Sequence, residues 1–198
     1  MSSFNLMLFG VYPYIALAIC LIGSWARFDL SQYTWKAGSS QIFHRTAAEQ
    51  LYMRRASNLF HVGVLFVLAG HFVGLLMPAS LYHYVISTQN KQLLAMVSGG
   101  FFGTLCLIGL LMLLKRRLTD DRVRASSSTS DILILVVLLV QLLLGLGTIF
   151  ASTKHMDGSV MVMLANWAQY IVTLQPQLAA ESIAPVGLVY KLHVFLGL

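Results

Sequence analysis

The sequence predicts an all-α fold: a polytopic membrane helical bundle of five transmembrane helices, the fifth incomplete, plus a short amphipathic interfacial helix. Of the 198 residues, 58% are hydrophobic and only 10% are charged, which is too little charge to cover the surface of a soluble domain. Long apolar runs recur along the chain, and about 20 apolar residues are enough to span a bilayer core. We expect residues 1–198 to form one membrane-embedded domain.

Four apolar segments are long enough to cross a bilayer. They are residues 4–28, 56–77, 92–114 and 131–151. Pro13 lies inside the first segment, where a membrane helix tolerates it. Pro78 is expected to end the second segment, and the basic run 115–117 the third. The serine-rich stretch 125–130 offers an N-cap for the fourth. Because the N-terminus lacks a basic region typical of a signal peptide, the first helix is expected to be retained.

The last part of the chain predicts two shorter helices. Residues 158–174 carry apolar side chains at helical spacing with polar residues between them. This pattern indicates a short amphipathic helix with Trp167 and Tyr170 near the lipid headgroups. A fifth apolar segment opens near Pro185 and reaches Leu198, a length of about 21 Å against the ~30 Å of the bilayer core. We therefore expect the fifth helix to be incomplete in this chain.

The basic residues are distributed unevenly over the two sides of the predicted bundle. One side has ten of them: Arg27, Lys36, Arg45, Arg54, Arg55, Lys115, Arg116, Arg117, Arg122 and Arg124. The loops of the other side offer only Lys91 and Lys154. The positive-inside rule places the richer side in the cytoplasm and the N-terminus outside. Since the charges act as topology signals, the net charge of +6 does not indicate nucleic-acid binding.

Small residues inside the spans indicate mainly packing. Cys20 and Cys106 lie in apolar segments without CxxC spacing, so we expect packing thiols rather than a disulfide or a metal pair. Two glycine pairs follow the GxxxG pattern, Gly70 with Gly74 and Gly99 with Gly103. The first pair allows either close helix packing or room for the edge of a flat cofactor, and the second favours plain packing.

Two histidines, His61 and His71, fall within the second segment, where an ionisable side chain is a functional hypothesis by default. They lie about 15 Å apart along the helix axis and about 80° apart around it, so one helix presents ligands at two depths. Imidazole ligates haem iron, and two axial imidazoles leave no open position, which suits electron transfer. His193, in the fifth segment, lies at the depth of His71, and we pair these two on a b-type haem. The partner of His61 is expected beyond Leu198.

Other interpretations of the histidines remain open at this point. They could be hydrogen-bonded groups that pack the bundle, or proton-relay groups of a transporter. Three histidines at matching depths on two helices favour haem, while few acidic residues and no broken-helix pairs argue against a transporter. His44, His83 and His155 lie in loops and are expected to be solvated or interfacial.

Longer motifs carry a family resemblance. They are Tyr12-Pro13-Tyr14-Ile15-Ala16, Leu21-Ile22-Gly23-Ser24-Trp25, Gln32-Tyr33-Thr34-Trp35, Ala56-Ser57-Asn58-Leu59-Phe60-His61, Gly70-His71-Phe72, Leu105-Cys106-Leu107-Ile108-Gly109, Leu113-Leu114-Lys115-Arg116-Arg117-Leu118, Arg122-Val123-Arg124-Ala125, Asp131-Ile132-Leu133-Ile134-Leu135 and His155-Met156-Asp157-Gly158. These motifs cover nearly the whole chain and resemble the gamma chain of respiratory nitrate reductase, from the first helix onwards.

The resemblance implies a five-helix dihaem cytochrome b in the bacterial cytoplasmic (inner) membrane, with a periplasmic N-terminus. Such a subunit takes electrons from quinol and passes them to an iron–sulfur beta subunit. That subunit feeds a molybdenum alpha subunit, which reduces nitrate in the cytoplasm, so no catalytic residue for nitrate is expected in this chain. The resemblance implies His71 and His193 as ligands of the distal haem, and His61 as one ligand of the proximal haem.

The resemblance also implies a quinol site. Lys91, at the outer start of the third helix, matches a lysine involved in quinol binding, and Gly70 and His71 would form the adjacent wall. By itself Lys91 reads as a helix-end lysine whose ammonium reaches the headgroup region. The alternatives for the whole chain are a cytochrome b subunit of formate dehydrogenase, hydrogenase or sulfite-type reductase, or a non-redox transporter with proton-relay histidines.

Overall fold

The computed structural model describes residues 3–30, 46–154 and 156–198. Over these ranges the regular structure is helical throughout, without a strand, which confirms the all-α prediction. Four helical segments are long and apolar enough to cross a membrane. They are Ser3–Leu30 (α1 Ser3–Leu6, the π-helix η1 Met7–Val11 and α2 Tyr12–Leu30), α4 Ala47–Leu76, α6 Thr88–Thr119 and α8 Thr129–Ser152. The shorter helices are α5 Ala79–Tyr82, α7 Asp121–Ala125, α9 Ser159–Val172, α10 Pro176–Ile183 and α11 Leu188–Gly197.

The long helices extend beyond the apolar segments that predicted them. Arg54 and Arg55 lie inside α4 rather than in a loop, because the Thr46 hydroxyl caps the helix by accepting from the Glu49 amide at 3.2 Å. The basic run 115–117 does not end α6, since Lys and Arg are good helix formers and only the apolar character stops there. Lys36, His44, Arg45 and His155 lie outside the described residues.

Two predicted helix boundaries are confirmed. Helix α4 ends at Leu76, directly before Met77 and Pro78, because proline disfavours the helical conformation of the residue before it. Helix α8 begins after Ser128, whose hydroxyl accepts from the Asp131 amide while the Asp131 carboxylate accepts from the Ser128 amide. This capping box satisfies two amides that a helix end otherwise leaves unpaired.

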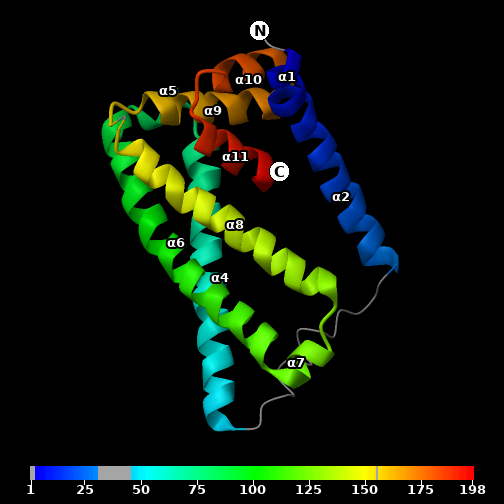
Figure 1. The fold of residues 1–198 in the computed structure, drawn as a ribbon. Helices are drawn as coiled ribbons and strands as arrows, with labels where there is room; N and C mark the ends of the chain where they lie inside the picture. The colour runs from blue at the N-terminus through cyan, green and yellow to red at the C-terminus, as the bar shows by residue number, and fades with distance from the viewer. Residues whose placement is uncertain (1–2, 31–45, 155) are drawn as a thin grey trace.

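Helices α4 and α6 pack closely side by side (Figure 1). A Cβ on Gly63 would lie 2.5 Å from the main-chain nitrogen of Cys106, and one on Gly109 would collide with the main chain of Phe60. Cys106 is a buried free thiol at this crossing, as the packing interpretation predicted. Small residues allow the two backbones to approach.

Of the GxxxG glycines, Gly103 fits the predicted close packing and Gly99 does not, while the open space at Gly70 and Gly74 agrees with the alternative of room for the edge of a flat cofactor. A Cβ on Gly70, Gly74 or Gly99 would meet no described atom within 4 Å, whereas one on Gly103 would lie 2.9 Å from Leu146 of α8. The contact faces of α4 and α6 are set by where the helices cross, and the crossing lies at Gly63 and Gly109. The pattern alone carries no information on which face meets a neighbour.

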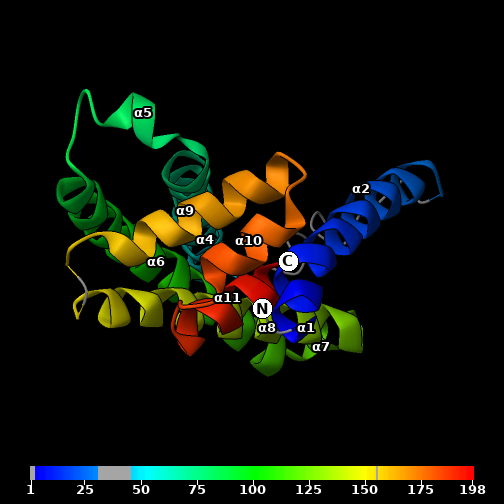
Figure 2. The same cartoon turned by 90° about the horizontal axis from the view of Figure 1, so that it is seen from above.

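A cap closes one end of the bundle. Helix α9 lies across the end of α4, and α10 packs on α9 beside η1 (Figure 2). Their buried side chains form what we call the cap cluster: Phe9, Trp167, Ala168, Ile171, Ala179, Ile183, Val186 and Tyr190. From the cap, α11 runs back into the bundle against α8, while α2 leads away from α4, α6 and α8 (Figure 1). The cap therefore holds the two ends of the described chain together.

Trp167, predicted to lie near the headgroups, is part of the cap cluster with only 7% of its surface exposed. Its indole N–H donates to the Phe9 carbonyl at 2.9 Å. That carbonyl needs a partner because Pro13, four residues later, has no amide hydrogen to complete the helix. The π-helix η1 lies just before this proline, where a widened turn accommodates the ring. The hydrogen bond to the Phe9 carbonyl therefore stabilises the Trp167 side chain inside the cap cluster.

Candidate functional site

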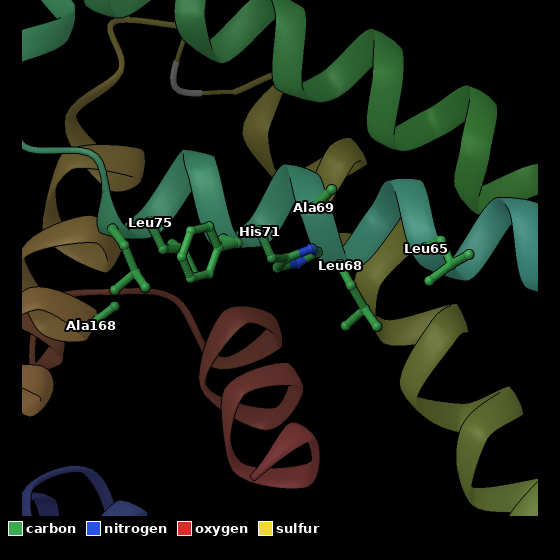
Figure 3. Close-up of a pocket in the computed structure, with 8 residues that line it drawn as sticks. Leu65, Leu68, Ala69, His71, Leu75 and Ala168 are labelled. Atoms are coloured by element: carbon green, nitrogen blue, oxygen red, sulfur yellow. The ribbon is translucent and has the colours of Figure 1, made fainter.

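His71 lies on α4 with its imidazole directed toward the side of the bundle where α11 lies (Figure 3). Its Nδ1 is 2.8 Å from the Val67 carbonyl, one turn earlier. A carbonyl oxygen only accepts, so Nδ1 carries the hydrogen and the lone pair of the ring is on Nε2. His61 makes the same contact, with Nδ1 2.7 Å from the Ser57 carbonyl. Both α4 histidines therefore present a free Nε2, the arrangement that a metal-ligating histidine requires.

His71 and His193 are brought together from α4 and α11. Their ring centroids are 6.0 Å apart and their planes are inclined by 48°. Two metal–nitrogen bonds of about 2.0 Å, plus roughly 1 Å from each nitrogen to its ring centre, place two axial imidazoles about 6 Å apart. The observed separation therefore fits a metal between the rings.

The surroundings of His71 suit a flat apolar group. An open hollow of about 630 Å³ runs along α4 beside it, within the size range of small-molecule and cofactor sites. Its lining is almost wholly apolar: Leu65, Leu68, Ala69, His71, Phe72, Leu75 and Leu76 from α4, and Ala168 from α9 (Figure 3). Such a lining accepts a macrocycle but offers no ligand set for a bare ion.

The number of ligands distinguishes a haem from a protein-held metal ion. Among the described residues no group of three or more His, Cys, Asp and Glu side chains is placed to hold a metal. A haem supplies four nitrogens of its own and needs only two axial side chains. Two imidazoles at this separation, one of them lining an apolar hollow, therefore fit a b-type haem.

His61 lies about 15 Å further along α4 toward the uncapped end of the bundle. Its ring has an edge contact with the neighbouring Phe60 at 5.3 Å. Among residues 3–30, 46–154 and 156–198, no second histidine ring contacts the ring of His61. Its sequence-predicted partner would lie beyond Leu198.

Lys91 occupies the first turns of α6 at the capped end, where it is 8% exposed. Its ammonium lies 3.8 Å from the centre of the Tyr82 ring, and no described atom hydrogen-bonds to it. Neither Lys91 nor Gly70 lines the hollow beside His71. The structure thus brings His71 and His193 together, and Lys91 is a buried cation at the same capped end whose ammonium favours an anionic or polar ligand.

Sequence reasoning missed three residues of α8 that contact α11 near His193. Gly145 lies against the His193 ring, and Gln141 donates to the His193 carbonyl at 3.0 Å. Ser152 shares a 2.8 Å hydrogen bond with Tyr190. A signal was present, because Gln141 is the one amide side chain within an otherwise apolar span, and buried amides require partners.

Comparison with known proteins is consistent over the whole chain. A family model described as nitrate reductase gamma subunit matches residues 5–198. The respiratory nitrate reductase 1 gamma chain of Escherichia coli (strain K12) is 48% identical over 198 residues, which is 100% of this chain and 85% of that protein. The respiratory nitrate reductase 2 gamma chain of the same strain is 45% identical over 98% of this chain and 83% of its own length. The nitrate reductase gamma chain of Bacillus subtilis (strain 168) is 33% identical over 96% and 83%.

Proposed function

The chain belongs to the nitrate reductase gamma subunit family, and on that premise we propose that it carries electrons from quinol toward the iron–sulfur beta and molybdenum alpha subunits. It is a membrane subunit of the respiratory nitrate reductase, of cytochrome b type. Membership in this family sets aside the alternatives of a transporter and of a formate dehydrogenase or hydrogenase subunit. We assign below the residues that hold the haems and those that bind quinol.

His71 and His193 would hold the distal haem by ligating its iron from α4 and α11. The observation that carries this assignment is the 6.0 Å between the centres of the two rings, with an apolar hollow that His71 lines and His193 does not. Val67 fixes the tautomer of His71 by accepting from its Nδ1, which directs the Nε2 lone pair outward and raises the basicity of the ligand. When bound, a b-type haem supplies reversible one-electron transfer, and two such groups at different depths allow the electrons of a quinol to cross the membrane one by one.

His61 holds one side of the proximal haem, with a partner beyond Leu198. Supporting this assignment, its Nδ1 faces the Ser57 carbonyl as that of His71 faces Val67. The same tautomer therefore occurs at both depths of α4. His71 and His61 therefore lie at successive depths along α4, from the capped end toward the end of the helix that carries Arg54 and Arg55.

Quinol binds at the capped end, which faces the periplasm of the bacterial inner membrane. Lys91, Gly70 and His71 form its site. Lys91 has a buried ammonium without a hydrogen-bond partner among the described atoms, and a quinol oxygen would supply one. Gly70 leaves open space on α4 next to His71. Oxidation releases the two quinol protons on this outer side.

The test compares His71→Ala with His61→Ala in the assembled enzyme in membranes. His71→Ala removes one of two b-type signals in the reduced-minus-oxidised spectrum and abolishes quinol oxidation, because a single imidazole does not hold a bis-histidine iron. His61→Ala removes the other signal and retains the first. Two intact haem signals and normal quinol turnover in His71→Ala would overturn the assignment.

A further inference from the structure

The rings of His71 and His193 face each other from helices with different neighbours. Helix α4 packs on α6 and α9, whereas α11 packs on α8. Helix α11 has only ten residues, and helices of that length are marginal without tertiary contacts. Tyr190 and Val194 of α11 also pack in or against the cap cluster, so α8 and the cap together hold the helix that presents the His193 imidazole.

Gly145 of α8 lies directly behind the His193 ring. A Cβ at this position would come within 2.9 Å of Cε1 and within 3.5 and 3.6 Å of Nε2 and Nδ1. The edge of the imidazole thus rests on the main chain of α8, in a space that any larger residue would fill. The ring, rather than the α11 backbone, is the part that would have to move.

Gln141, one turn before Gly145, holds the backbone of the same residue. Its side-chain amide donates to the His193 carbonyl at 3.0 Å, and its Nε2 would lie 2.5 Å from a Cβ on Gly197. The amide therefore touches α11 at two successive turns. An amide in the middle of a membrane span is costly unless it is hydrogen-bonded. The Gln141 Nε2 has the His193 carbonyl as its partner, whereas its Oε1 has none among the described atoms.

Ser152 completes the contact at the capped end by its 2.8 Å hydrogen bond to Tyr190, one turn before His193. Positions 141, 145 and 152 lie within about 40° of one another around a helix axis. We call them the α8 face. This face contacts α11 before, at and after His193.

We infer that the α8 face positions the His193 imidazole opposite His71, with Gly145 and Gln141 acting as positioning residues for this haem ligand. The inference rests on the proposed function, since it assumes that His193 is an axial ligand. Neither residue touches the iron. Their effect is on the angle between the two imidazole planes, 48° in this structure.

The experiment is electron paramagnetic resonance of the oxidised, assembled enzyme, together with redox titration of both haems. In a ferric haem with two imidazole ligands, the largest g value depends on the angle between the ring planes. Gly145→Ala is expected to shift or eliminate the distal low-spin line and to shift the distal midpoint potential. The proximal line, which depends on His61, serves as an internal control and stays unchanged.

Gly147→Ala is the matched control, because it makes the same substitution on the same helix. Its Cβ would lie 3.7 Å from Val189 of α11, an ordinary contact, and it should leave both lines unchanged. An unchanged distal line and potential in Gly145→Ala would overturn the inference. Equal shifts in Gly145→Ala and Gly147→Ala would also overturn it, since they would indicate general α8–α11 packing.

Gln141→Met provides a second test that keeps the length of the side chain and removes the amide. It is expected to shift the distal line and potential by less than Gly145→Ala while both haems are retained. If Gly145→Ala does not assemble, this variant decides, and wild-type distal spectra in it would reject the role. Failure of the proposed function looks different, because His71→Ala would then keep the distal signal.

Discussion

The two histidines of α4 have different surroundings although they lie ten residues apart on one helix. His71 lies near the cap, opposite His193 and beside an apolar hollow. His61 lies toward the uncapped end, where the aromatic ring described against it is that of Phe60 and no second histidine ring is described. The hydrogen bond at Nδ1 is nevertheless the same for both. The tautomer is thus a local property of α4, while completion of a ligand pair depends on tertiary contacts.

The largest expected effect tests whether His71 and His193 belong to one site. We predict that His71→Ala, His193→Ala and the double variant all lose the same single haem signal, because either ligand is indispensable to one iron. Combining His71→Ala with His61→Ala should remove both signals. Haem content and reduced-minus-oxidised spectra of the assembled enzyme measure this. Additive losses in the His71 and His193 double variant would assign the two histidines to separate groups.

A smaller effect, on kcat/KM for quinol, is expected at Lys91. It tests whether quinol binds at the His71 end of α4. Lys91→Met should lower kcat/KM for quinol by roughly 10- to 150-fold, since losing a hydrogen bond from a charged group costs about 1.5–3 kcal/mol. Both haem signals should remain. Lys154→Met, which removes an exposed lysine near the same end, is the control. Steady-state quinol oxidation with an unchanged kcat/KM in Lys91→Met would remove Lys91 from the site.

The sequence predicted the parts of the fold that depend on local chemistry. The four spans, Pro78 as a stop and the capping residue in the serine-rich stretch follow from apolar length and helix-end preferences. The depth argument that joined His71 with His193 needed only the rise of a helix. The spans and helix ends are encoded within single segments, and the depth of each histidine follows from its position in one segment, so these features are readable without tertiary information.

Features that arise between segments were not predictable in the same way. The crossing of α4 and α6 at Gly63 and Gly109 follows from mutual packing, and neither glycine belongs to the GxxxG pairs. The role of Gly145 depends on where the His193 ring lies. Trp167 was expected near the headgroups because its helix is amphipathic, but its hydrogen-bond acceptor, the Phe9 carbonyl, lies 158 residues away in sequence.

The smallest effect concerns this last contact and tests how the cap is held. Trp167→Phe should lower the free energy of unfolding by about 1–3 kcal/mol, because it leaves the buried Phe9 carbonyl without a donor. In a Pro13→Ala background the alanine amide supplies an intrahelical donor to the Phe9 carbonyl. Trp167→Phe should then lower the free energy of unfolding by much less. Denaturant unfolding in detergent, arranged as a double-mutant cycle, measures the difference. Trp25→Phe, at a tryptophan that is 72% exposed, controls for loss of the indole itself. An equal cost of Trp167→Phe in both backgrounds would mean that indole packing, rather than the carbonyl released by Pro13, holds the cap above His71.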